Sequence, residues 1–252
     1  MPVTVQPVFG AFDYSASSCD ISEWSDEIPS RAPVVEIPRS DRARAQAGNL
    51  SPRVVSIRGV IGQDGGSDRE TLRNLVDAFT WAHRPGLRSL YRDTDRYFKQ
   101  AQVESLTLGD DTGLSWVPFA VRFRVADPFY YATAPDAADL WNLSGGSRNL
   151  SNTGAATALP KLTFAIGGTG ETTLVVTNTT TGKAFTLSGH MVMGDSLVVD
   201  CDAQTVKQNG VNRMSYFTGE FWPLDPGVNN LTVAVTGGPL ITVTSQWTRR
   251  WL

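Results

Sequence analysis

The clearest alternation of apolar and polar positions in the chain lies between residues 117 and 125. The apolar side chains share one face at a period of two: Val117, Phe119, Val121, Phe123 and Val125. This period predicts a β-strand with one buried face. Arg122 and Arg124 lie on its other face, which is expected to be solvent-exposed and positively charged. Asp127-Pro128 ends the strand, because proline has no N–H for the ladder and restricts the residue before it.

The composition changes after this strand. Phe129 to Tyr131 form an aromatic group, and the chain then becomes rich in Ala, Ser, Gly and Asn. We predict that the strand is the last of a first domain, residues 1–131, and that residues 132–252 form a second. A strand in the middle of one large sheet is the alternative, because 252 residues suffice for either arrangement.

One segment, residues 68–83, has the period of an amphipathic helix. Ser67 and Glu70 form a capping box ahead of an apolar run. The apolar positions recur every three or four residues: Leu72, Leu75, Val76, Phe79 and Ala82. Arg84-Pro85-Gly86 ends the segment. A single helix with a narrow stripe is expected to cover a sheet, and we interpret His83 at its end as a partly charged imidazole that favours the helix dipole.

Ahead of the helix, short apolar runs predict a hairpin of residues 33–38 against 53–61. A polar loop at 39–53 joins the two strands and carries four arginines: Arg39, Arg42, Arg44 and Arg53. Loops of this length in compact domains are usually functional or disordered. Two interpretations stay open, an arm that reaches a neighbouring subunit and a solvated loop.

From residue 161 onward the pattern contains only strands. Short runs of alternating residues recur at intervals of about ten residues, and turn signals such as Asn209-Gly210 separate them. This arrangement predicts an antiparallel β-sandwich. With the one-helix first half, the chain is expected to be mainly β.

The composition excludes several classes of protein. The chain is 41% apolar and 19% charged, which is typical of a folded globular protein, and its net charge of -3 gives no nucleic-acid signature. No apolar run approaches the roughly 20 residues of a membrane helix, and the first twenty residues lack the pattern of a secretory signal. Cys19 and Cys201 lie in different predicted domains and are not expected to form a disulfide.

The sequence contains no motif for catalysis, cofactor binding or metal ligation. His83 and His190 have no partners at metal-ligand spacing, and neither a phosphate-binding loop nor a nucleophile elbow is present. Asp200, Asp202 and Glu220 have the chemistry of a glycosidase, but a solvated sheet face and an exposed charge explain them equally well. We therefore predict no catalytic residue, no metal and no cofactor.

Three tryptophans in the last third of the chain suggest a different activity: Trp222, Trp247 and Trp251. Exposed indoles stack on sugars, and β-sandwiches often carry such sites, although large aromatic side chains are usually buried. Trp222 and Trp251 are the candidate sugar-stacking residues. A carbohydrate-binding protein that recognises a host surface is thus the alternative function.

A series of turn residues gives the second half a particular order. They are Asp127-Pro128-Phe129, Asn152-x-Gly154, Pro160, Gly167-Gly168, Asn178-Thr-Thr-Thr-Gly182, Asp200, Asn209-Gly210 and Leu224-x-Pro226-Gly227-x-Asn229. In this order, after a one-helix β domain, the chain resembles the distal tail protein family of long-tailed, non-contractile bacteriophages, the siphoviruses. The resemblance covers most of the chain and is loosest over the first thirty residues.

The resemblance implies a fold and a role. The first domain would form a ring, and the second would be a galectin-like antiparallel β-sandwich that projects from it. Six copies, assembled in the host cytoplasm, would join the tail tube protein to the tail-tip hub or fibre protein of the virion. The lumen would admit the tape measure protein, and DNA as cargo only. A domesticated tail-like particle fits the same resemblance, which carries over no catalytic residue and no membrane contact.

A closed ring needs two different and complementary patches on each subunit, because head-to-tail contacts are heterologous. Residues 1–30 are acidic, whereas the loop at 39–53 is basic. We expect these two segments to be the opposing patches. The candidate interface residues are therefore Arg39, Arg42, Arg44 and Arg53.

Overall fold

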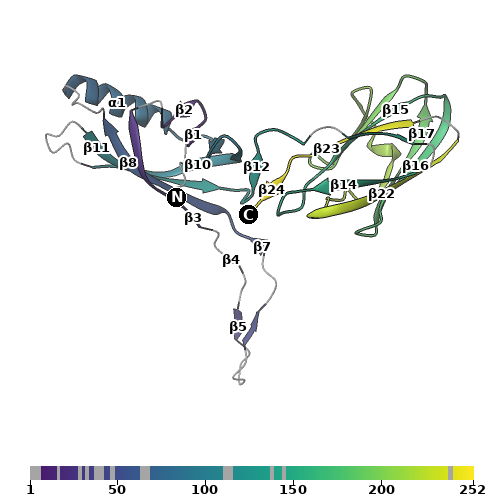
Figure 1. The fold of residues 1–252 in the computed structure, drawn as a ribbon, viewed down its shortest axis with the longest axis horizontal. Helices are drawn as coiled ribbons and strands as arrows, with labels where there is room; N and C mark the ends of the chain where they lie inside the picture. Colours follow the sequence, from purple (N-terminus) through teal and green to yellow (C-terminus); the bar gives the residue numbers. More distant parts are fainter. Residues whose placement is uncertain are drawn as a thin grey trace. The chain divides into compact units, whose positions relative to one another are not determined.

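The computed structural model describes residues 7–15, 18–27, 30–31, 34–36, 43–45, 49–62, 69–109, 116–136, 139–143, 146–237 and 241–252. The chain divides into two compact units, Met1–Thr133 and Ala134–Leu252. Both consist mainly of antiparallel strands (Figure 1), and α1 (Arg69–Ala82) is the one α-helix within the described ranges. The expected mainly β class is confirmed.

The first unit is an antiparallel sheet with the strand order β2–β1–β9–β10–β11–β8–β3. Its strands are β1 (Val8–Phe9), β2 (Phe12–Asp13), β3 (Cys19–Glu27), β8 (Arg53–Gly62), β9 (Arg88–Tyr91), β10 (Arg96–Leu108) and β11 (Trp116–Val125). A further strand, β12 (Tyr130–Ala132), pairs with the start of β10. The strand predicted at 117–125 is β11, and it pairs with β8 over its whole length.

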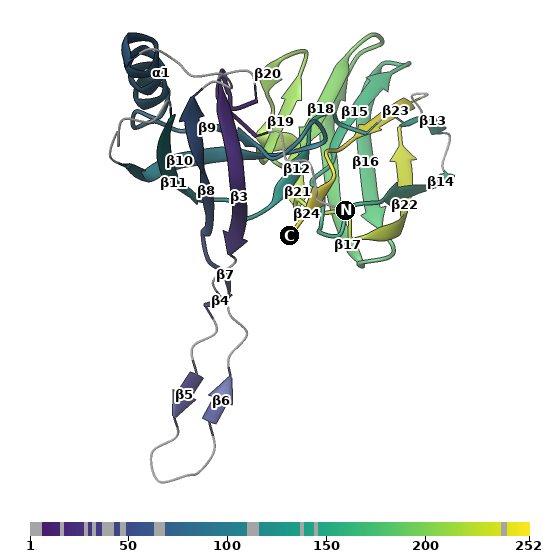
Figure 2. The same cartoon turned by 60° about the vertical axis from the view of Figure 1, so that its left-hand side comes forward.

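Helix α1 covers one face of this sheet, as its apolar stripe predicted (Figure 2). Leu72 and Phe79 are its buried residues, and the ring of Phe79 lies 4.7 Å from that of Phe119 on β11. In the sheet, the odd-numbered residues of β8 and β11 are buried. The apolar stripe of the helix, which repeats every three to four residues, and the buried faces of the strands, which repeat every two, therefore form one core.

His83 follows the last residue of α1 and belongs to an aromatic cluster in that core. It is 3% exposed, and its ring lies 4.2 Å from the ring of Phe79. Its nitrogens contact the hydroxyl of Tyr14 and the carbonyl of Phe79. Burial lowers the pKa of His83 to about 4, although the hydrogen bond to Phe79 opposes the shift. The interpretation of a partly charged imidazole is therefore wrong, because the ring is neutral at neutral pH.

The predicted hairpin of 33–38 against 53–61 is also wrong. The partner of β8 is β3, with Trp24 opposite Ile57. Between them lie two short pairs, β4 (Ser30–Arg31) with β7 (Asn49–Leu50) and β5 (Val34–Glu36) with β6 (Ala43–Ala45). We call residues 30–50 the arm. A short β segment could be expected near Ile21 to Trp24, but not the full length of β3 or its pairing with β8, because no residue of this outer strand is fully buried and its pattern shows no clear alternation.

The second unit consists of two antiparallel sheets, with the orders β13–β23–β15–β18–β19–β20 and β14–β22–β16–β17–β21. The elements are β13 (Asp139–Leu143), β14 (Gly146–Asn152), β15 (Lys161–Ile166), β16 (Gly170–Asn178), β17 (Lys183–Met191), β18 (Ser196–Asp200), β19 (Thr205–Gln208), β20 (Val211–Asn212), the 3-10 helix η1 (Met214–Tyr216), β21 (Phe217–Gly219), β22 (Gly227–Thr236), β23 (Ile241–Gln246) and β24 (Arg250–Trp251).

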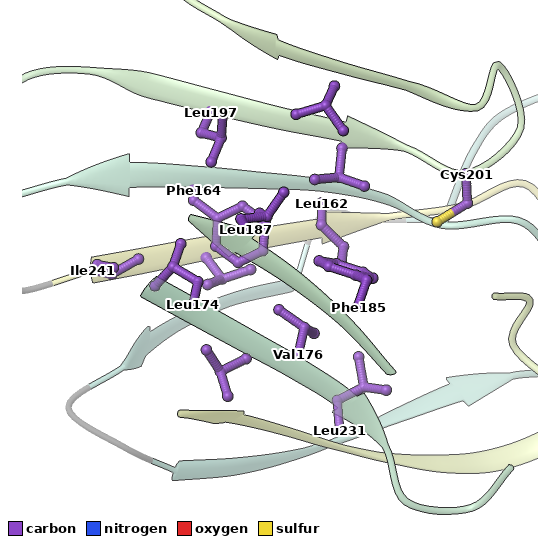
Figure 3. Close-up of a cluster of buried hydrophobic side chains, with 14 of the residues drawn as sticks. Leu162, Phe164, Leu174, Val176, Phe185, Leu187, Leu197, Cys201, Leu231 and Ile241 are labelled. Atoms are coloured by element: carbon purple, nitrogen blue, oxygen red, sulfur yellow. The ribbon is translucent and has the colours of Figure 1, made fainter. Parts of the chain in front are cut away.

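Apolar side chains from both sheets meet in one core, which Figure 3 shows in close-up. They include Leu162, Phe164, Leu174, Val176, Phe185, Leu187, Leu197, Cys201, Leu231 and Ile241. All but Cys201, which follows β18, come from strands of the two sheets, and their neighbours in sequence are less buried. The expected β-sandwich is confirmed.

The turn residues on which the family resemblance rests have specific structural roles. Asn152 is buried, and its side chain donates to the carbonyl of Ala156 at 2.9 Å and accepts from the N–H of Gly154 at 3.0 Å. Gly154 runs close to the backbone of Arg250, where an added Cβ would lie 2.6 Å from a carbonyl oxygen. Asn152-x-Gly154 is therefore a motif that this packing requires.

Candidate interaction surfaces

The carboxylates considered for catalysis have structural roles. Asp200 accepts hydrogen bonds from the N–H groups of Asp202 and Ala203, at 3.0 and 2.9 Å, and so closes the turn after β18. Glu220 is exposed and lies 3.6 Å from the ammonium group of Lys183. These are turn and surface contacts, and we assign no acid–base pair to them.

Metal and membrane sites receive no support from the described residues. No three of their His, Cys, Asp or Glu side chains are grouped as metal ligands, and none of their helices is long and apolar enough to span a membrane. Neither Cys19 nor Cys201 forms a disulfide, as expected. A groove of about 350 Å³ beside α1 has mostly apolar walls, with Arg73 and Asp77 as its charged lining residues.

The four arginines expected at a subunit interface do not share one environment. Arg39 and Arg42 lie outside the described residues. Arg44 is the middle residue of β6, where it pairs with Val35. Arg53 is the first residue of β8 and is 3% exposed.

The surroundings of Arg53 show why it is not a surface residue. Its guanidinium carbon lies 4.8 Å from the ring centroid of Tyr130 and 5.4 Å from that of Phe98. A guanidinium nitrogen is 3.9 Å from the carboxylate of Asp26, which also accepts a 2.5 Å hydrogen bond from the hydroxyl of Tyr130. We therefore correct the expectation for Arg53, which is an internal anchor where β3 and β8 lead into the arm.

The two candidate sugar-stacking tryptophans also differ from each other. Trp222 is fully buried, and its ring stacks on Phe185 at 5.7 Å. It therefore has no face for a sugar, and that expectation is wrong. Trp251 in β24 is half-buried, and the guanidinium carbon of Arg249 lies 5.7 Å from its ring.

Several large apolar side chains are exposed that the sequence analysis did not single out. Trp81 is 69% exposed because it lies on the side of α1 opposite the stripe of Leu72 and Phe79. In the sandwich the exposed apolar residues include Val192, Met193, Val211 and Met214. The signal for Trp81 was its position off the helical stripe. Val192 and Met193 lie in a turn, and Val211 and Met214 lie in β20 and η1, which are too short to show a period.

The arrangement of the second unit can be compared with known proteins. Residues 153–251 match the family described as siphovirus-type tail component, C-terminal domain. The tail component domain therefore covers nearly all of the second unit. A search of curated protein sequences found no match for the chain.

The whole chain shares its fold with solved phage proteins. The crystal structure of the Dit protein of phage SPP1, described as a paradigm of the hub adsorption apparatus of phages infecting Gram-positive hosts, matches with a TM-score of 0.76 and 17% identity. The match covers 99% of this chain and 100% of that one. A chain of the phage P2 baseplate in its activated, calcium-bound conformation matches with a TM-score of 0.50 and 8% identity, over 97% of each.

These matches confirm the resemblance drawn from the sequence. The tail component family accounts for the sandwich, and the Dit fold accounts for both units together. The chain has the fold of the SPP1 Dit protein, and its second unit matches the siphovirus-type tail component family. The proteins that it matches are structural proteins of phage tails.

Proposed function

We propose that this chain is the adaptor at the distal end of a siphovirus-type tail. Six copies close into a ring that joins the tail tube protein to the tail-tip hub or fibre protein. The ring is assembled in the host cytoplasm and lies at the tail tip of the virion. Its lumen admits the tape measure protein, and DNA only as cargo.

One observation carries the proposal, the likeness to the SPP1 Dit protein along the full length of both chains. Sandwiches alone are common scaffolds with many functions. The full-length match is more specific. It combines a one-helix sheet with a tail component domain, in the same order as in the SPP1 Dit protein, and such a combination is much less common than a sandwich alone.

The first unit has a feature that suits a ring. Strand β3 ends the sheet order, so within the described residues its outer edge has no strand partner. A nine-residue open edge invites association unless something covers it. Exposed Asp20 and Glu27 make this edge acidic, whereas Glu23 is paired with Arg58. The two acidic side chains would complement the arginines of the arm on the next subunit.

The solution mass of the purified chain tests the proposal. We expect six times the subunit mass of 27.3 kDa in light scattering, either alone or with the tail tube and tail-tip proteins of the same virus. A monomer under all of these conditions would refute it.

The structure favours the hub over the carbohydrate-binding alternative. Burial of Trp222 removes one of the two residues on which that alternative rested. We therefore propose no sugar site.

A further inference from the structure

The chain passes from the first unit to the second between Thr133 and Ala134. On each side of this crossing, hydrogen bonds hold the backbone within its own unit. The positions of these bonds determine how many residues of the crossing keep free backbone angles.

On the first side, Thr133 is anchored to the turn between β9 and β10. Its N–H donates to the carbonyl of Asp95 at 3.1 Å, and its hydroxyl donates to the carbonyl of Thr94 at 2.9 Å. The turn is itself closed by Asp93, whose carboxylate accepts from the N–H groups of Asp95 and Arg96, both at 2.9 Å. Thr133 is therefore fixed to the first unit.

On the second side, Asp136 is anchored to the sandwich. Its N–H donates to the carbonyl of Trp247 at 2.9 Å, and Trp247 belongs to the core of this unit. A carboxylate oxygen of Asp136 lies 2.8 Å from Nε of Arg249. Burial raises the pKa of Asp136, and the guanidinium of Arg249 opposes this shift. We call Asp136 and Arg249 the clasp.

The segment that carries Arg249 is also held in place. The carbonyl of Arg250 accepts from the N–H of Ala156 at 3.0 Å, and its guanidinium donates to the hydroxyl of Thr157 at 3.0 Å. Gly154 lies against the backbone of the same residue. The clasp thus joins the entering chain to a part of the sandwich that cannot shift without breaking these contacts.

Only Ala134 and Pro135 lie between the two anchored residues. Both are exposed, and neither forms a hydrogen bond with another residue of the described ranges. The ring of a proline fixes its φ near about −65°, and the residue before a proline is restricted to extended conformations. This crossing is therefore short and has few torsion angles that can change.

We propose that Ala134–Pro135 is the hinge between the two units and that the clasp confines the hinge to these two residues. Units with separate cores are expected to move relative to each other, and a few residues at the ends of elements absorb the change in backbone angles. Here the proline and the clasp reduce that motion to a narrow pivot. The inference goes beyond the proposed function, because it concerns the single chain and holds whether or not six copies close into a ring.

The distribution of distances between the two units tests the hinge. Spin labels are attached to p-acetylphenylalanine in place of Ala78 and Lys207, which are exposed on α1 and β19, so neither cysteine is changed. The labelled full chain is mixed with excess unlabelled chain, so that distances between copies do not contribute. Double electron–electron resonance should give one narrow distribution for the wild type.

The variant Pro135→Gly frees φ inside the hinge. We expect the distribution to widen by at least about twofold, because glycine has access to many more backbone conformations than proline. The matched control is Pro226→Gly, which replaces another exposed proline of the second unit. The control should keep the width of the wild type.

The variant Asp136→Asn tests the clasp, because it removes the charge with almost no change in shape. We expect a wider distribution and, from local opening of the C-terminal segment, trypsin cleavage after Arg249 at least about fivefold faster. Glu220→Gln breaks the exposed ion pair with Lys183 in the same unit and should change neither result.

A width that neither Pro135→Gly nor Asp136→Asn changes would overturn the hinge. So would a wild-type distribution as broad as that of Pro135→Gly. Unchanged cleavage after Arg249 in Asp136→Asn would refute the role of the clasp. Because these measurements report distances within one chain, their outcome is independent of the solution mass that tests the proposed function.

Discussion

At the scale of single residues, burial determines the charge of His83, although its place at the end of a helix would favour the protonated form. Its pKa of about 4 lies below the ordinary value of 6.5, so between these limits the unfolded chain binds a proton that the folded chain excludes. Stability should therefore rise with pH through this window, by up to roughly 1.4 kcal/mol per pH unit. Thermal unfolding of the full chain from pH 4 to 7 measures the slope.

The variants His83→Gln and His190→Gln separate this effect from the rest of the chain. Glutamine at position 83 does not titrate, so the slope should become smaller. His190 is exposed, and its replacement should leave the slope unchanged. Equal slopes in the wild type and in His83→Gln would show that His83 does not set the acid sensitivity.

Arg53 and Arg58 form a matched pair on the same strand. Arg53 is buried against Tyr130 and Phe98, whereas Arg58 is 63% exposed and 3.2 Å from Glu23. Arg53→Ala removes packing and leaves Asp26 without its cation, so we expect a loss of about 2 kcal/mol or more. Arg58→Ala breaks a surface ion pair and should cost at most about 1 kcal/mol.

Chemical denaturation of both variants gives the comparison. The ion pair of Arg58 is the shorter one, and a ranking by distance alone would put its loss first. If Arg58→Ala proves the more damaging change, the role of Arg53 as an anchor is wrong.

At the scale of elements, the sequence predicted those helices and strands whose buried residues recur with a regular period. β11 and α1 each bury one face, so their apolar residues recur with the period of the element. β3 buries no face, and its pairing with β8 could not be inferred from a pattern that it lacks. The turn residue Asn152 could be recognised, but its hydrogen bond to the carbonyl of Leu224, at 3.2 Å, depends on the tertiary fold.

The candidate sites were harder to predict for a related reason. A tryptophan that binds a sugar and a tryptophan in a core look the same in the sequence. The structure shows that Trp222 is fully buried and stacks on Phe185. The turn between β17 and β18 is held by Asp195, which accepts hydrogen bonds from the side chains of Gln208 at the end of β19 and Asn209 just after it. Sequence spacing does not reveal such a meeting, since it depends on the register of β18 and β19.

The arm is the element on which the expected subunit contact depends. Replacing Arg39, Arg42 and Arg44 with glutamate should convert a ring into monomers in light scattering, because the acidic edge of the next subunit would be repelled. The matched control reverses three exposed cations of the sandwich: Arg148, Lys161 and Lys183. A ring that survives the arm reversal unchanged would show that these arginines make no essential contact.

At the scale of the whole molecule, the two units have different roles in the account. The first combines an open strand edge with a long hairpin arm, which suits contact with copies of itself. The second is a β-sandwich that matches the tail component family, and a buried carboxylate, Asp195, links two of its turns. The proposed function therefore places the ring contacts in the first unit.

Negative-stain imaging of the purified full-length chain, alone and mixed with its tail tube and tail-tip proteins, tests the central claim most directly. The account predicts rings with sixfold symmetry and an open centre, from which one sandwich per subunit projects. Single 27.3 kDa particles that neither close into rings nor bind a tail protein would contradict it.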